Sequence, residues 1–131
     1  MTSSQNIIDP GDAHSDKVQA AQAPYLSMVD AAKDQVTRYT QQSQEMFAAS
    51  QHEAAEARKT ATDASFKEQS GWHHSVSDAL RRVSAMHQGK AAKYQEAAKK
   101  MYWAAYKLNQ YIPVYESAAN QAADAARAQA V

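Results

Sequence analysis

Small and apolar residues recur along this chain in alternating steps of four and three positions. In the first half the pattern runs through Tyr25, Val29, Ala32, Val36, Tyr39, Ser43 and Met46, then after a four-residue step through Ser50 it continues with Ala54, Ala57, Ala61 and Ala64. In the second half it runs without a gap through Tyr94, Ala98, Met101, Ala105, Leu108, Ile112, Tyr115, Ala119, Ala122 and Ala126. A repeat of seven places one narrow stripe along a helix face, as in the contact seam of a coiled coil or helical hairpin. The pattern therefore predicts two long helices that pack through this stripe.

Two glycines between the stripes are candidates for the point where the chain reverses, Gly71 in QSGWHH and Gly89 in MHQGK. The residues between them have the pattern of a short amphipathic helix: Trp72, Val76, Leu80 and Val83. A turn at Gly71 pairs two arms of nearly equal length, 24–69 and 72–128. A turn at Gly89 pairs a longer, bent first arm with residues 90–128. The matched lengths favour Gly71 and the local sequence favours Gly89, so both turns stay open.

The N-terminal segment differs from the rest in composition. Residues 1–15 are polar and contain Pro10 and Gly11, which predicts a flexible arm followed by a single helical hairpin domain, 16–131. Pro24 suits the first turn of a helix, where its missing N–H is not needed. Pro113 lies inside the second stripe and predicts a kink near Tyr111.

Composition narrows the kind of packing. The 131 residues include 29 alanines but only three leucines, so we expect helices packed through small side chains and no sheet. Two such helices bury little surface. We therefore predict an all-α fold, an elongated antiparallel helical hairpin that pairs into a four-helix bundle as a homodimer or heterodimer.

Charge and cysteine content exclude several classes. The formal net charge is zero, which disfavours nucleic acid as a partner. Residues 1–70 carry ten acids and six bases, and residues 71–131 carry four acids and eight bases, so antiparallel arms would complement each other. The chain has no cysteine, which excludes disulfides and thiolate metal sites.

The run MYWAAYKLNQYIPVY holds more aromatic residues than one narrow seam can cover. Aromatic side chains are enriched where proteins meet their partners. We expect an interface for a partner helix, with packing by the N-terminal segment as the alternative; the residues are Tyr94, Met101, Tyr102, Trp103, Tyr106, Leu108, Tyr111 and Tyr115. A basic face accompanies the run: Lys90, Lys93, Lys99, Lys100 and Lys107. Such a face can bind an anionic membrane surface. We expect it instead to pair with acidic groups of this chain or of a protein partner.

No pattern of an enzyme occurs in the sequence. There is no glycine-rich phosphate loop, nucleophile elbow or pair of carboxylates in an apolar setting, so we expect a non-enzymatic protein without a cofactor. His52 and Glu56 have the i, i+4 spacing of helical metal sites. Both face away from the stripe, and we interpret them as part of a solvated helix face rather than as metal ligands.

The stretch MHQGKAAKYQEA resembles the turn of the WxG-motif small helical-hairpin proteins of type VII secretion. His87 stands where that family has tryptophan and Gly89 where it has glycine, followed by Ala91, Ala92 and Tyr94 at similar spacing. The resemblance covers residues 72–126. It implies a tight turn at His87–Gly89 and a bacterial protein that is cytoplasmic or secreted without a signal peptide of the Sec type.

These observations predict a protein-interaction module. Its most specific version is a type VII secretion substrate or secretion-associated hairpin that acts with a partner. One alternative is a structural or scaffold subunit of a phage or filament assembly. The other is an amphipathic, phasin-like coat on an apolar surface.

Overall fold

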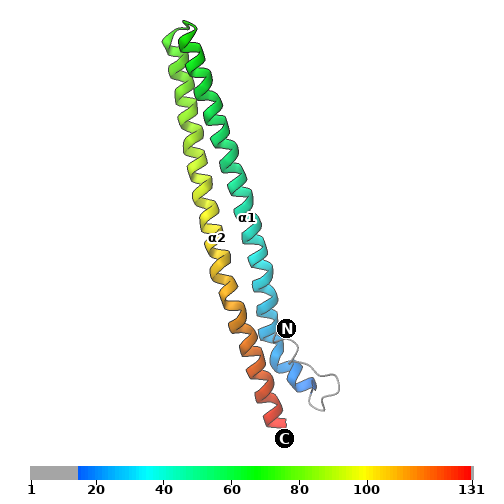
Figure 1. The fold of residues 1–131 in the computed structure, drawn as a ribbon. Helices are drawn as coiled ribbons and strands as arrows, with labels where there is room; N and C mark the ends of the chain where they lie inside the picture. Colours follow the sequence, from blue (N-terminus) through cyan, green and yellow to red (C-terminus); the bar gives the residue numbers. More distant parts are fainter. Residues whose placement is uncertain (1–14, 131) are drawn as a thin grey trace. The chain divides into compact units, whose positions relative to one another are not determined.

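Two long α-helices make up the part of the chain that the structure, a computed structural model, describes, residues 15–130. Helix α1 spans Ser15–Gln69 and helix α2 spans His74–Ala130. The two helices pack against each other as an antiparallel hairpin (Figure 1). The predicted all-α hairpin is therefore confirmed. Of the arm predicted for residues 1–15, only Ser15 lies within the described residues, and it opens α1.

The hairpin divides into two compact units. Unit 1 combines the part of α1 up to Arg38 with the part of α2 from Ala104, and unit 2 comprises Tyr39–Trp103 with the turn. In each unit a segment of α1 lies beside a segment of α2.

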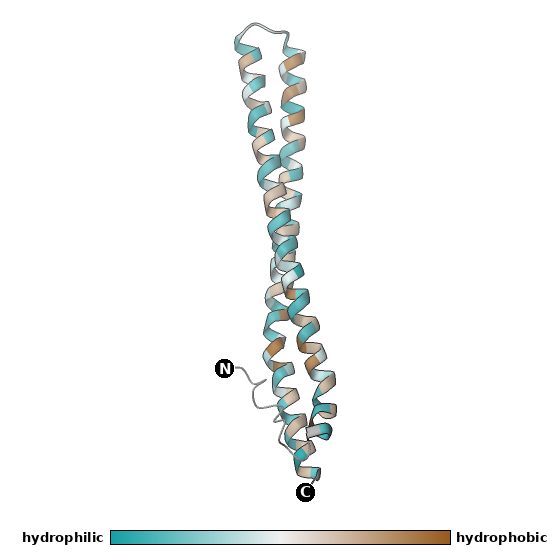
Figure 2. Ribbon diagram, turned by 90° about the vertical axis from the view of Figure 1, so that its right-hand side faces the viewer, coloured by the Kyte–Doolittle hydropathy of each residue, from teal (hydrophilic) through white to brown (hydrophobic). Residues whose placement is uncertain are grey.

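Alanine-rich composition explains why both helices run so far without a break, because alanine has the highest helix propensity. Ion pairs one turn apart add support on the outer faces, such as Arg38 with Asp34 at 3.0 Å and Lys67 with Asp63 at 3.5 Å. Exposed pairs of this kind contribute about 0.3–0.5 kcal/mol each. Strongly hydrophobic residues form separate bands along both helices rather than a broad stripe (Figure 2).

The seam lies on the predicted repeat of seven. Every seventh residue of α1 from Gln22 to Ala64 is buried or half-buried, and so is every seventh residue of α2 from Ser77 to Ala126. We call these positions the seam residues: Gln22, Val29, Val36, Ser43, Ser50, Ala57 and Ala64 in α1, and Ser77, Ser84, Ala91, Ala98, Ala105, Ile112, Ala119 and Ala126 in α2. The seam expected from Tyr25 and from Tyr94 onward is thus largely confirmed. The amphipathic pattern expected between the two glycines is right only in part. Val76 and Leu80 are half-buried in α2, but Trp72 and Val83 are exposed, and Ser77 and Ser84 are the buried residues there.

Unit 1 has a small core of ordinary composition. Val29, Ala32 and Ile112 are buried together, and three half-buried side chains pack against them: Val36, Leu108 and Tyr115. Farther along, the Gln22 side chain is fully buried and donates from Nε2 to the Ala119 carbonyl oxygen at 3.3 Å. The Gln22 Oε1 atom has no hydrogen-bond partner.

The chain reverses at Gly71, which has φ +82°. The Gly71 N–H donates to the Glu68 carbonyl oxygen at 3.3 Å and the Trp72 N–H to that of Lys67 at 3.0 Å. This nested pair of bonds is the Schellman motif, which satisfies the last carbonyls of a helix and needs a left-handed residue. The Lys67 ammonium also lies 4.6 Å from the centre of the Trp72 ring. Past the turn, the Ser75 N–H at the start of α2 donates to His73 Nδ1 at 3.2 Å.

The turn predicted at His87 and Gly89 is wrong, because both residues lie inside α2. A single helical glycine costs only about 1 kcal/mol, which the surrounding helix formers offset. Pro24 also lies inside a helix rather than in its first turn, since α1 begins at Ser15 and the preceding turns are held by buried Val18 and Gln22. Helix α2 continues through Pro113, so the chain does not break there.

Alanine substitutions at the two glycines should have opposite effects. Gly89→Ala is expected to stabilise the protein by about 1 kcal/mol, because a Cβ at this helical position meets nothing within 4 Å. Gly71→Ala is expected to destabilise it by about 1–2 kcal/mol, because φ is positive there. Urea unfolding followed by circular dichroism measures both changes. A loss of stability in Gly89→Ala would contradict the continuous helix.

Neither α1 nor α2 is long and apolar enough over any stretch to cross a membrane.

Candidate interaction surface

The interior of unit 2 is made of the smallest side chains. Every fully buried residue of this unit is an alanine or a serine: Ser50, Ala57, Ala64, Ser77, Ser84 and Ala98. Buried alanine and serine contribute far less apolar area than leucine or phenylalanine. Unit 2 is therefore held together by close packing rather than by a thick core.

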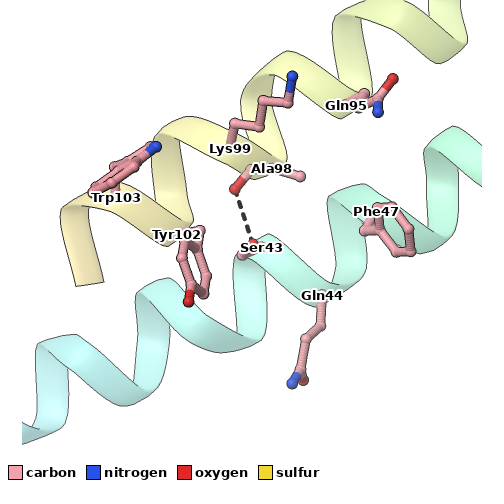
Figure 3. A pocket seen from close by; sticks show the side chains of 8 residues that line it. All are labelled: Ser43, Gln44, Phe47, Gln95, Ala98, Lys99, Tyr102 and Trp103. Atoms are coloured by element: carbon pink, nitrogen blue, oxygen red, sulfur yellow. Dashed lines mark hydrogen bonds between the residues drawn. The ribbon is translucent and has the colours of Figure 1, made fainter. Parts of the chain in front are cut away.

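Serine hydroxyls bond directly to the backbone of the opposite helix. The Ser43 hydroxyl donates to the Ala98 carbonyl oxygen at 2.9 Å, as Figure 3 shows. Two further bonds of this kind follow along the seam, from Ser50 to the Ala91 carbonyl at 2.9 Å and from Ser84 to the Ala57 carbonyl at 2.7 Å. Because a serine side chain is short, these bonds form only where the two helices approach closely.

Most of the large apolar side chains of unit 2 lie on the outside. Eight of them are exposed: Phe47, Phe66, Trp72, Val83, Met86, Tyr94, Tyr102 and Trp103. Scattered single exposed residues are common on soluble proteins, but a group around an apolar hollow marks an interaction site. In unit 2 the buried side chains are small and most of the large apolar ones are exposed, which is the reverse of the arrangement in a domain that is stable alone.

An open groove brings three of these residues together on one side of unit 2. We call it the aromatic groove; it has a volume of about 330 Å³ and is lined by Ser43, Gln44, Phe47, Gln95, Ala98, Lys99, Tyr102 and Trp103 (Figure 3). Phe47 is 49% exposed, Tyr102 61% and Trp103 56%, so each has about half of its surface or more available to a partner. Tyr102 and Trp103 are in edge-to-face contact, with ring centres 6.4 Å apart. This contact limits the freedom of both rings before a partner binds.

A second apolar patch lies on the other side of unit 2. The Phe66 patch has Phe66, Leu80 and Val83 at its centre and charged groups around it, among them Glu56 and Asp63. Phe47 comes four residues after a seam residue and Phe66 only two after one. At about 100° per residue these offsets place the two phenylalanines on opposite flanks of the seam.

The residues predicted as an interface divide between the two units. Tyr94, Met101, Tyr102 and Trp103 belong to unit 2, and Tyr106, Leu108, Tyr111 and Tyr115 to unit 1. Met101, Leu108 and Tyr115 are half-buried beside the seam residues, whereas the other five are exposed. In unit 1 Tyr111 stacks on Tyr115, with ring centres 6.3 Å apart. Tyr102 and Trp103 are the two that the structure places in the aromatic groove.

Two phenylalanines of the exposed surface were missed by the sequence pattern, Phe47 and Phe66. Both stand outside the repeat of seven in α1, where the pattern gives them no role. The signal that identifies them is the contrast with their neighbours, because the adjoining seam residues are only serine and alanine.

A polar pair bridges the helices in the middle of unit 2. His87 Nδ1 lies 3.0 Å from Glu53 Oε2, and both side chains are mostly buried. His52, the exposed neighbour of Glu53, is not part of this contact. Within residues 15–130 no group of three or more His, Asp or Glu side chains is placed to hold a metal ion.

Comparison of the chain with protein-family models, with curated proteins and with solved structures gave no match.

Proposed function

We propose that this protein is a non-enzymatic interaction module that binds a protein partner through the aromatic groove of unit 2. The observation that carries the proposal is the reversed distribution of side chains, with alanine and serine inside and phenylalanine, tyrosine and tryptophan outside. Rigid aromatic anchors around an apolar hollow are the usual source of binding energy at protein interfaces.

The groove favours a side chain or helix of a protein over a small molecule. It is open to solvent and its exposed lining is mostly apolar, and the Ser43 hydroxyl is already bonded to the Ala98 carbonyl oxygen. Small-molecule sites enclose most of the ligand and use converging polar groups. A helix from another chain needs only an apolar channel with polar margins.

A scaffold role in a phage or filament assembly is the second candidate, supported by the Phe66 patch. Apolar surfaces on opposite flanks let successive copies join head to tail without closing a ring. The resemblance to type VII secretion substrates adds no further support, because the residues that carry it, His87 and Gly89, lie inside α2.

Photo-cross-linking in the cells that make the protein tests the proposal. A photoreactive benzoylphenylalanine in place of Phe47 should form covalent adducts with a protein. The same residue in place of Ala48, an exposed neighbour in the same helical turn, should form few.

Mass spectrometry of the adducts decides between the candidates. Protein adducts that form from position 47 and not from position 48 support the interaction module. Lipid adducts would instead support the phasin-like surface coat, and equal yields from both positions would overturn the role of the groove.

A further inference from the structure

The flank that carries the aromatic groove is almost free of charge near the groove. It consists of the residues one and four positions after each seam residue, which point to the same side of the hairpin. Near the groove these are Thr40, Gln44, Phe47, Gln51 and Ala54 in α1 and Ala85, Gln88, Ala92, Gln95, Lys99 and Tyr102 in α2. Lys99 is the single charged side chain among them. Trp103 lies one position beyond this flank, five residues after Ala98, and the exposed Glu96 has the same position five residues after Ala91. The charges of Lys99 and Glu96 offset each other, so the occupant of the groove needs no net compensating charge.

The other lysines of this region point elsewhere. Lys93 and Lys100 come two residues after a seam residue and Lys90 six, which places all three on the flank opposite the groove. An acidic partner would be drawn to that flank. The composition of the groove flank, rich in glutamine, alanine and aromatic residues, instead fits a surface of the same kind.

A second copy of this chain offers such a surface. The formal net charge is zero and the isoelectric point about 7.0, so two copies do not repel each other near neutral pH. In a two-fold arrangement the same flank faces itself, and each Phe47 ring can enter the partner groove beside Tyr102 and Trp103. A long Lys99 stem can lie along the apolar surface while its ammonium stays in water.

The flank along the whole of unit 2 has the area that a stable dimer needs. Toward the turn it also carries two bases and two acids, Arg58, Arg81, Glu68 and Asp78, so its formal charge is balanced there, and Arg81 and Glu68 pair with each other at 3.2 Å. The α1 segment of unit 2, Tyr39–Gln69, is about 45 Å long at 1.5 Å per residue. Two helices side by side are about 20 Å wide, which gives roughly 900 Å² for the flank. A standard protein interface buries about 800 Å² on each partner.

We propose that the groove flanks of two copies pair into a four-helix arrangement, in which Phe47, Tyr102 and Trp103 of each chain are covered by the other. This inference rests on the proposed function and goes further by naming the partner.

Sedimentation equilibrium of the purified full chain tests the pairing. Over micromolar concentrations the wild type should reach twice the 14.4 kDa of one chain. The variant Phe47→Ser/Trp103→Ser should dissociate about tenfold more readily or worse, because it removes two central aromatic anchors. Phe66→Ser, the matched change on the opposite flank, should leave the dimer intact.

A fluorescence measurement keeps the test valid if the double variant loses helix content. In Trp72→Phe the remaining tryptophan is Trp103, since the chain has two. Its emission should move to shorter wavelength over the concentrations at which the mass doubles. If the mass doubled without this shift in the Trp103 emission, the interface would lie elsewhere and the proposal would be overturned.

The remaining outcomes separate this inference from the proposed function. A monomer at all concentrations would overturn the pairing, and cross-links from position 47 to a different protein would then leave the interaction module standing. Masses that grow beyond the dimer, and that Phe66→Ser returns to the mass of a monomer, would also overturn it, because they would mean that the groove of one copy binds the Phe66 patch of the next. Absence of any protein adduct at position 47 would overturn both.

Discussion

Replacing Ile112 with alanine is expected to lower the free energy of unfolding by about 2–4 kcal/mol. Ile112 is buried against Val29 and Ala32 in unit 1. The substitution removes apolar atoms and leaves a cavity that two rigid helices fill poorly. Urea unfolding monitored by circular dichroism gives the change directly.

The matched control is Val114→Ala, two residues along the same helix. Val114 is exposed, so its truncation should change the stability by less than about 0.5 kcal/mol. Equal effects of the two substitutions would mean that unit 1 has no core at Ile112.

Enlarging Ala57 to leucine is expected to cost about 1–3 kcal/mol. Ala57 is buried in the seam of unit 2, and its carbonyl oxygen accepts the Ser84 hydroxyl at 2.7 Å. Added carbon atoms would hold the helices apart and break this bond. A substitution that adds apolar bulk to this interior should therefore destabilise the protein. In a core that contains cavities, the same change could fill a cavity instead.

Ala55→Leu serves as the control, because Ala55 is exposed in the same turn of α1. It keeps high helix propensity and should be nearly neutral. If Ala57→Leu proved as stable as this control, the close approach of the helices in unit 2 would be refuted. Thermal unfolding of both variants at one protein concentration provides the comparison.

The hairpin and most of its seam could be predicted from the sequence, because a repeat of seven allows few arrangements of a long helix. Positions such as Ala98, Ala105 and Ile112 follow from spacing alone. The position of the turn could not be predicted from the sequence. No local sequence feature distinguishes Gly71 from Gly89 as strongly as the contacts between the two helices do. In the structure Gly71 has the positive φ and the Schellman bonds of a helix end, whereas Gly89 lies inside α2.

The candidate surface was predicted only in part. Tyr102 and Trp103 stood out as aromatic residues in excess of one seam. Ser77 and Ser84 were missed as seam residues because the interpretation of this segment followed its larger apolar residues, Val76, Leu80 and Val83. The Ser84 hydroxyl bonds to the opposite backbone at Ala57, and the Ser77 hydroxyl bonds to the His74 carbonyl in its own helix. Tyr94 was expected in the seam, but it is exposed, since helices this close leave little room for a phenol ring between them.

The short connection Ser70–His73 determines how the two helices align along each other. Alanine recurs at intervals of seven residues in both helices. If one helix shifted along the other by one heptad, small side chains would therefore still meet. Such a shift moves one helix about 10 Å along the other, and the connection could follow only if a helix end unravelled. The tether thus selects one alignment out of several similar ones, and a chain cleaved within it would lose that selection.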